Sequence, residues 1–183
     1  GCSGLGSMIY GLTLVANMLQ RDDWFDDAFA LSNLMTEEAV WNDERLDVLS
    51  GSAGTLLALL ALWECRPEKR LLTLAEACGR TLLERQTTTP VGERAWTTFK
   101  GKALCGFSHG AAGIALALLR LYRCTGNSSF RDAAREGIRY ERRLYSTELS
   151  NWPDLREEPA AAMVSWCHGA AGIGLGRVAC LEI

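Results

Sequence analysis

The stretch VSWCHGAAGI at residues 164–173 decides the fold of this chain. It places a cysteine beside a histidine, directly before a Gly-x-x-Gly turn that opens an apolar helix. The stretch SHGAAGI at residues 108–114 repeats the design, and these two segments contain both histidines of the chain. A single histidine is more typical of a helix cap or a filled polar gap. Two histidines before the same glycine turn indicate a functional role for His109 and His168.

The repeat has a fixed length. Gly51, Gly110 and Gly169 are spaced 59 residues apart, and each opens a Gly-x-x-Gly turn followed by an apolar segment. Two of these segments, Thr55–Glu64 and Ile114–Arg123, are followed by an amphipathic one, because apolar residues recur there at helical spacing. The pattern predicts repeating pairs of a buried inner helix and an outer helix with one wet face.

Such pairs stack into an open solenoid or a closed ring, so we predict an all-α fold. Residues 4–35 read as one further helical hairpin, whereas residues 87–101 have the composition of a loop. No segment shows the alternation of a strand. We expect one domain over residues 1–183. It should be part of a longer protein, because the chain starts without Met and its last helix has no stop signal.

Composition excludes several classes of protein. The formal net charge is -3 and no dense Lys/Arg run occurs, which argues against nucleic acid as a partner. The apolar runs are shorter than the ~20 residues of a membrane span. Seven cysteines, an odd number at wide spacing and mostly in apolar segments, favour buried thiols in a reducing cytoplasm over a disulfide framework.

The residues before each inner helix should meet at one end of the stack. Asp47, His109 and Cys167 are the chemical groups that this arrangement would bring together, within roughly 10 Å of one another. Glycine permits positive φ and close approach, so we also expect the helix N-termini to point free N–H groups into a shared cavity.

Three segments of this sequence resemble consecutive motifs of the lanthionine synthetase C-like (LanC-like) family. They are LDVLSGSAG at residues 46–54, SHGAAG at 108–113 and SWCHGAAGIGL at 165–175. The Trp-Cys-His-Gly form is most similar to the C-terminal cyclase domain of class II lanthipeptide synthetases (LanM type). The resemblance implies an α/α toroid of helical hairpins with one zinc ion at the end of its central cavity.

The resemblance also implies roles for individual residues. Cys167 matches the first zinc ligand, and the remaining cysteine and histidine ligands are expected in a later motif downstream of Ile183. His109 matches the catalytic histidine, and Asp47 the aspartate that assists it. His168 stands where some members have a tyrosine, and we count it among the catalytic candidates. Stand-alone cyclases carry an arginine at the position of Met163, so the role of that arginine is in doubt in this sequence.

The implied reaction is the addition of a cysteine thiolate, activated by Zn²⁺, to a dehydroalanine or dehydrobutyrine of a precursor peptide. His109 would accept and donate the protons, and Asp47 would orient the imidazole of His109. The substrate would be a precursor peptide that consists of a leader and a dehydrated core. The protein would be cytoplasmic. It could also associate with a membrane export complex.

Two alternatives remain open. A non-catalytic LanC-like zinc protein would bind glutathione or act as a scaffold. A carbohydrate-active α/α toroid would need paired carboxylates, and Asp43, Glu44 and Asp47 cluster before only one of the inner helices.

Overall fold

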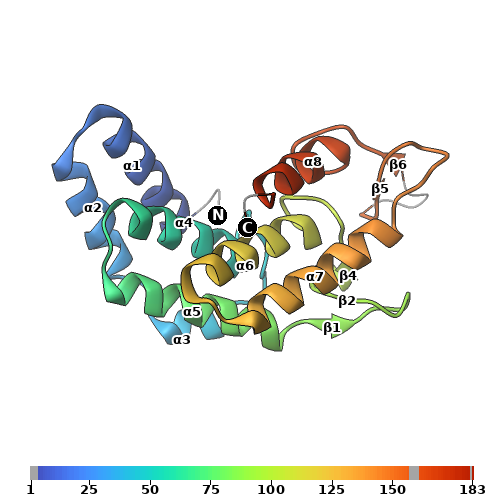
Figure 1. Cartoon of the computed structure of the whole chain (residues 1–183), viewed down its shortest axis with the longest axis horizontal. Helices are drawn as coiled ribbons and strands as arrows, with labels where there is room; N and C mark the ends of the chain where they lie inside the picture. Colours follow the sequence, from blue (N-terminus) through green and yellow to red (C-terminus); the bar gives the residue numbers. More distant parts are fainter. Residues whose placement is uncertain (1–3, 157–160, 182) are drawn as a thin grey trace.

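Helical hairpins follow one another along the chain in a computed structural model, which describes residues 4–156, 161–181 and 183. The hairpins pair α1 (Leu5–Leu19) with α2 (Asp22–Ser32), α4 (Ser52–Cys65) with α5 (Lys69–Glu84), and α6 (Ala111–Thr125) with α7 (Ser128–Arg143). A short α3 (Glu37–Trp41) joins the first two, and α8 (Ala170–Ala179) follows the third. Figure 1 shows these elements arranged along a curved row. The predicted all-α class is confirmed.

The inner layer is formed by the helices that the repeat predicts. Helix α4 contacts α1 on one side and α6 on the other, and α6 in turn contacts α8. Because α4 and α6 are apolar around most of their circumference, they lie buried between neighbours. Helix α8 differs, since Leu175 and Val178 on its outer face are 60% and 65% exposed. Closure of the row into a ring stays a prediction.

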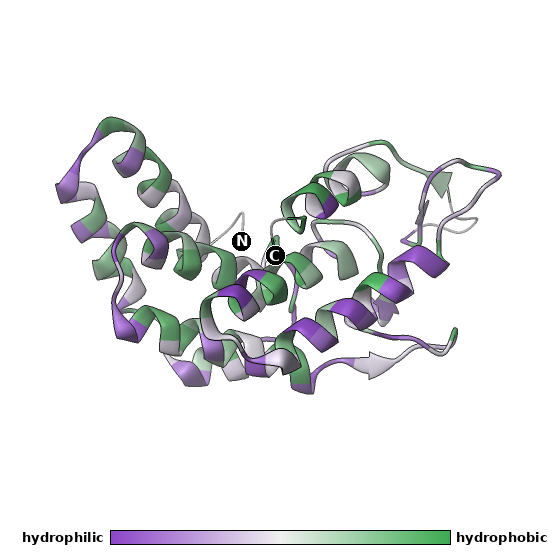
Figure 2. Ribbon diagram, in the orientation of Figure 1, coloured by the Kyte–Doolittle hydropathy of each residue, from purple (hydrophilic) through white to green (hydrophobic). Residues whose placement is uncertain are grey.

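The outer helices bury one stripe each. In α7 the stripe consists of Phe130, Ala133, Ala134 and Gly137, with Ile138 half-buried beside it. Figure 2 shows the hydrophilic residues of α7 opposite the hydrophobic inner helices. Glycine is needed at two contacts: a Cβ on Gly79 would meet the Phe130 ring at 2.7 Å, and one on Gly137 would meet the Trp96 ring at 2.6 Å.

The loop between α5 and α6 differs from its prediction. It forms two short antiparallel ribbons, β1 (Thr87–Thr88) with β2 (Arg94–Ala95) and β3 (Thr97–Phe99) with β4 (Lys102–Ala103). A third ribbon pairs β5 (Pro153–Asp154) with β6 (Ala161–Ala162). Strands of two or three residues are too short to show an alternating pattern, so the sequence could not reveal them. Within the described residues, no sheet exceeds two strands.

The cysteines of the described part are free thiols. Cys78 and Cys105 are buried, and burial raises the pKa of each to about 12, which keeps both protonated at neutral pH. Cys65 is exposed, contrary to the expectation that these thiols lie inside, and Cys2 falls outside the described residues. None of the helices described here has the length and apolar character needed to cross a membrane.

Candidate functional site

The turns before the three inner helices lie side by side and are joined by equivalent hydrogen bonds. The N–H of Leu49 donates to the carbonyl of Ser108 at 3.2 Å, and the N–H of Ser108 donates to the carbonyl of Cys167 at 3.3 Å. These three residues occupy the same position of the 59-residue repeat. The repeat therefore stacks its turns in register, as the sequence predicts.

Each turn also folds tightly onto its own helix, which explains its glycines. A Cβ on Gly51 would lie 2.4 Å from the backbone N of Leu46. A Cβ on Gly172 would lie 2.0 Å from the carbonyl oxygen of Trp166, so no larger residue fits without moving the backbone. Gly169 additionally has a φ of 87°, which favours glycine.

Contrary to the expectation from the sequence, the N-termini of α4 and α6 do not point free N–H groups into a cavity. These N–H groups form hydrogen bonds within the turns instead. The N–H of Ala53 donates to the Leu46 carbonyl at 3.1 Å, and the N–H of Ala112 donates to the Cys105 carbonyl at 3.3 Å. The N–H of Ser52 donates to Asp43 Oδ2 at 2.6 Å. At these two turns the groups left for chemistry are therefore side chains.

Asp47 and His109 form the strongest polar contact of the site. Oδ2 of Asp47 lies 2.6 Å from Nδ1 of His109, while Oδ1 accepts the N–H of Ser50 at 2.7 Å. The Asp47 side chain is 3% exposed and that of His109 is 19% exposed. A carboxylate is an acceptor, so this contact places a proton on Nδ1 and leaves Nε2 available for chemistry.

His109 is also held from behind. The hydroxyl of Thr98, on β3, donates to the His109 carbonyl, and the Phe99 ring lies 6.4 Å from the imidazole between centroids. The β3–β4 ribbon thus fixes the backbone from which the imidazole projects. This support was missed by the sequence analysis, which took residues 87–101 as a plain loop.

His168 stacks on His109, with ring centroids 5.9 Å apart and planes inclined by 25°. His168 is 5% exposed, and this burial lowers its pKa. Nearby Arg156 lowers the pKa further, whereas Asp154 raises it. A Cβ on Gly106 would lie 3.4 Å from Nδ1 of His168. The third turn therefore brings a second, more buried imidazole against the first.

Asp154 and Arg156 form an ion pair beside His168 that the sequence analysis did not find. The guanidinium of Arg156 contacts both carboxylate oxygens, with its Nη 2.7 Å from Oδ2 and its Nε 2.9 Å from Oδ1. This bonding lowers the pKa of Asp154, which is 4% exposed. Two charged residues in a polar stretch carry no pattern that would have marked them.

Asn151 organises the third turn. Its side-chain oxygen accepts the N–H of Ala170 at 2.8 Å, and its amide nitrogen donates to the Met163 carbonyl at 3.3 Å. Met163 thus contributes a backbone oxygen to this turn. Helix α8 is further tied to α7 by Arg177, which lies 2.6 Å from fully buried Glu141. Burial raises the pKa of Glu141, although Arg177 opposes the shift.

Cys167 adjoins the pair through its backbone. Its carbonyl oxygen accepts both the N–H and the hydroxyl of Ser108, each at 3.3 Å. Among the described residues, no three histidine, cysteine or acidic side chains come together in a way that could hold a metal ion. The zinc ion implied by the resemblance therefore stays a prediction, with Cys167 as its one proposed ligand in this sequence.

The carboxylates do not favour a carbohydrate-active site. Asp43 Oδ2 accepts the N–H and the hydroxyl of Ser52, both at 2.6 Å, which makes it a cap of α4. Asp47 is engaged by His109. Acid and base carboxylates of glycosidases face each other across a substrate, whereas these two are each bound to a partner within the protein.

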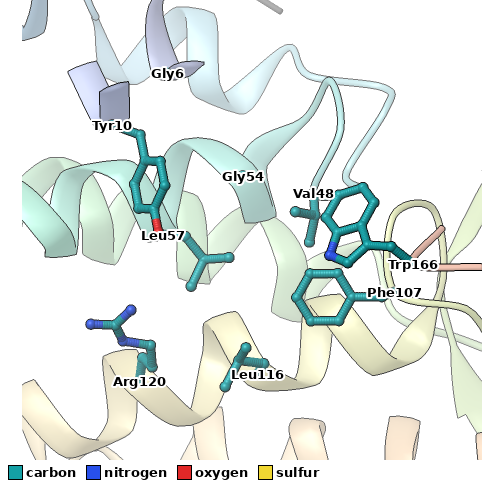
Figure 3. A pocket seen from close by; sticks show the side chains of 9 residues that line it. All are labelled: Gly6, Tyr10, Val48, Gly54, Leu57, Phe107, Leu116, Arg120 and Trp166. Atoms are coloured by element: carbon teal, nitrogen blue, oxygen red, sulfur yellow. The ribbon is translucent and has the colours of Figure 1, made fainter. Parts of the chain in front are cut away.

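A pocket of about 310 Å³ opens on the inner side of the row next to the Asp47–His109 pair. Figure 3 shows three of its walls, Val48, Phe107 and Trp166, gathered at one side. These residues occupy one position of the 59-residue repeat. The remaining lining comes from helices α1, α4 and α6, namely Gly6, Tyr10, Gly54, Leu57, Leu116 and Arg120.

No curated protein matches this sequence. The model of the family described as lanthionine synthetase C-like protein matches residues 1–183, the whole of the sequence. The match spans all three turns, the Asp47–His109 pair and the turn that carries Cys167. The chain therefore belongs to the lanthionine synthetase C-like family.

Proposed function

We propose that this protein is a lanthionine-forming peptide cyclase of the type found at the C-terminus of class II lanthipeptide synthetases. Its substrate would be a precursor peptide in which serine or threonine has been dehydrated. The observation that supports this most is the 2.6 Å contact between Asp47 and His109, in the turns that resemble the family's motifs. Such a pair suits proton transfer near neutral pH.

The reaction adds a thiol across a carbon–carbon double bond. The substrate sulfur bonds to the β-carbon of the dehydro residue, and the α-carbon must receive a proton, so no oxidant or reductant is needed. Nε2 of His109 faces away from Asp47 and can take the proton from the thiol and return it to the α-carbon. Asp47 keeps the imidazole oriented and stabilises its charged form between the two transfers.

Cys167 is proposed as a zinc ligand, with a cysteine and a histidine downstream of Ile183 as the other ligands. The bound metal would lower the pKa of the substrate thiol. We propose that His168 acts through His109: by stacking on it, the second imidazole limits the positions that the first can take. His168 is then a positioning residue.

The test is a cyclisation assay of the full-length protein on a dehydrated precursor peptide. Mass spectrometry after treatment with a thiol-alkylating reagent counts the cysteines that remain free. Wild-type protein should consume thiols, Cys167→Ala should lose zinc and activity together, and His109→Asn should retain zinc but lose ring formation. Full thiol retention with the wild-type protein, combined with stoichiometric glutathione binding, would instead support the non-catalytic alternative.

A further inference from the structure

The pocket beside the Asp47–His109 pair is built from the same turns as that pair. Val48 directly follows Asp47, Phe107 lies two residues before His109, and Trp166 directly precedes Cys167. Three of the residues that line the pocket therefore lie one or two positions along the sequence from Asp47, His109 and Cys167. Because Trp166 is 41% exposed, the aromatic wall can be reached from outside.

The aromatic wall is held firmly. The rings of Phe107 and Trp166 lie 5.5 Å apart at 53°, and the Phe107 ring would meet a Cβ on Gly176 of α8 at 3.2 Å. Phe107 is therefore wedged between its own turn and α8. Two neighbouring elements therefore support the aromatic side of the pocket.

The other end of the pocket carries a positive charge. Arg120 contacts Oε2 of Glu64 at 2.5 Å, while Arg123 contacts Oε1 of the same carboxylate at 3.0 Å. Two guanidinium groups share one carboxylate, so its charge does not balance both. No acidic side chain of the described residues lines the pocket. Figure 3 shows the guanidinium of Arg120 across the pocket from the aromatic wall.

We propose that this pocket is a substrate subsite that binds a large apolar side chain of the peptide next to an acidic residue. The apolar side chain would lie against Phe107 and Trp166, and the carboxylate would meet Arg120. The proposal rests on the proposed peptide substrate. It goes further by naming the local sequence that the protein selects.

The experiment measures binding apart from chemistry. Isothermal titration calorimetry would use short peptides in which serine replaces the dehydro residue, so that no ring can form. Three peptides are compared, which carry leucine–glutamate, leucine–glutamine or alanine–glutamate, respectively, at the two positions next to this serine. On wild-type protein we expect replacement of leucine by alanine to weaken binding about tenfold. Replacement of glutamate by glutamine should weaken it about fivefold.

Two variants assign these preferences to the pocket. Arg120→Gln should bind the glutamate and glutamine peptides equally, while still preferring leucine to alanine. Leu57→Trp, which fills the pocket, should lose the preference for leucine. Because the tryptophan could disturb α4, its thermal unfolding is measured as well, and the proposal stands on Arg120→Gln if Leu57→Trp does not fold.

Two further variants provide matched controls on the same ion pair. Arg123→Gln removes the other partner of Glu64 without touching the pocket lining. It should keep the preference for leucine and reduce the preference for glutamate, because Glu64 then balances the charge of Arg120 alone. Glu64→Gln should strengthen binding of the glutamate peptide about twofold, because Arg120 loses its competing carboxylate. Equal binding of all three peptides by wild-type protein, or no binding, would overturn the subsite. Ring formation by the wild type tests the cyclase function separately.

Discussion

His109 and His168 occupy the same position of the 59-residue repeat and stack on each other, yet their surroundings differ. His109 has Asp47 at hydrogen-bond distance, in the turn of the preceding unit. The equivalent of Asp47 one unit later is Gly106, and a Cβ there would lie 3.4 Å from Nδ1 of His168. One histidine therefore has a carboxylate partner where the other has only a glycine.

The same scaffold thus gives two histidines with different protonation chemistry. Stacked turns fix both imidazoles in equivalent places, and a single residue in the neighbouring turn then decides their chemistry. With a carboxylate, His109 can hold a positive charge while a proton moves. His168 has a glycine at the equivalent position; burial lowers its pKa more than nearby Asp154 raises it, which favours the neutral form.

The largest expected effect separates the two histidines directly. His109→Asn should slow ring formation about 10²- to 10⁴-fold, because it removes the group that transfers the proton. His168→Asn should slow it by less than about tenfold, because only the stacking contact is lost. Rates of thiol consumption on dehydrated peptide check both. Similar losses in the two variants would break the proposed distinction.

Asp47→Asn should cost about 10- to 100-fold in rate, because it removes the acceptor that orients His109 but leaves the imidazole in place. A double-mutant cycle with His109→Asn sharpens this prediction. If Asp47 acts through His109, adding Asp47→Asn to the His109 variant should cause almost no further loss. Fully additive losses would show that Asp47 has an independent role.

Gly106→Ala tests whether the fold requires glycine at the position equivalent to Asp47. The added Cβ would lie 2.6 Å from the carbonyl oxygen of Cys167, so the third turn must shift. We expect a loss of roughly 1 to 2 kcal/mol in the free energy of unfolding, measured by urea denaturation. Gly11→Ala is the control, because a Cβ there meets nothing within 4 Å, and it should not destabilise the protein.

The smallest expected effect concerns the ion pair beside His168. Since Arg156 lowers the pKa of folded Asp154, ionised Asp154 stabilises the fold above its unfolded pKa, and this stability is lost as the pH falls through the folded pKa. Asp154→Asn should therefore cost about 1 kcal/mol at pH 7. The difference from wild type should shrink below about pH 4. Exposed Glu148→Gln should show no such difference, and a pH-independent loss in Asp154→Asn would contradict the assignment.

Regular features of the sequence predicted most of the fold. The glycine spacing gave the inner helices α4, α6 and α8, and their shared register placed Asp47 near His109. Contacts without a periodic pattern were missed, including the support from Thr98, the Asp154–Arg156 pair and the role of Asn151. The N–H groups were misjudged because the sequence does not show that each turn folds back onto its own helix.

The most direct test of the distinction is nitrogen NMR of the imidazoles, because single substitutions of His109 and His168 identify the signals of each ring. In protein labelled with ¹⁵N at histidine, His109→Asn and His168→Asn assign the two sets of signals. We predict that neutral His109 carries its proton on Nδ1, and that Asp47→Asn changes this signal while leaving that of His168 nearly unchanged. A proton on Nε2 of neutral His109, or a His109 signal indifferent to Asp47→Asn, would contradict the pairing on which the proposed chemistry depends.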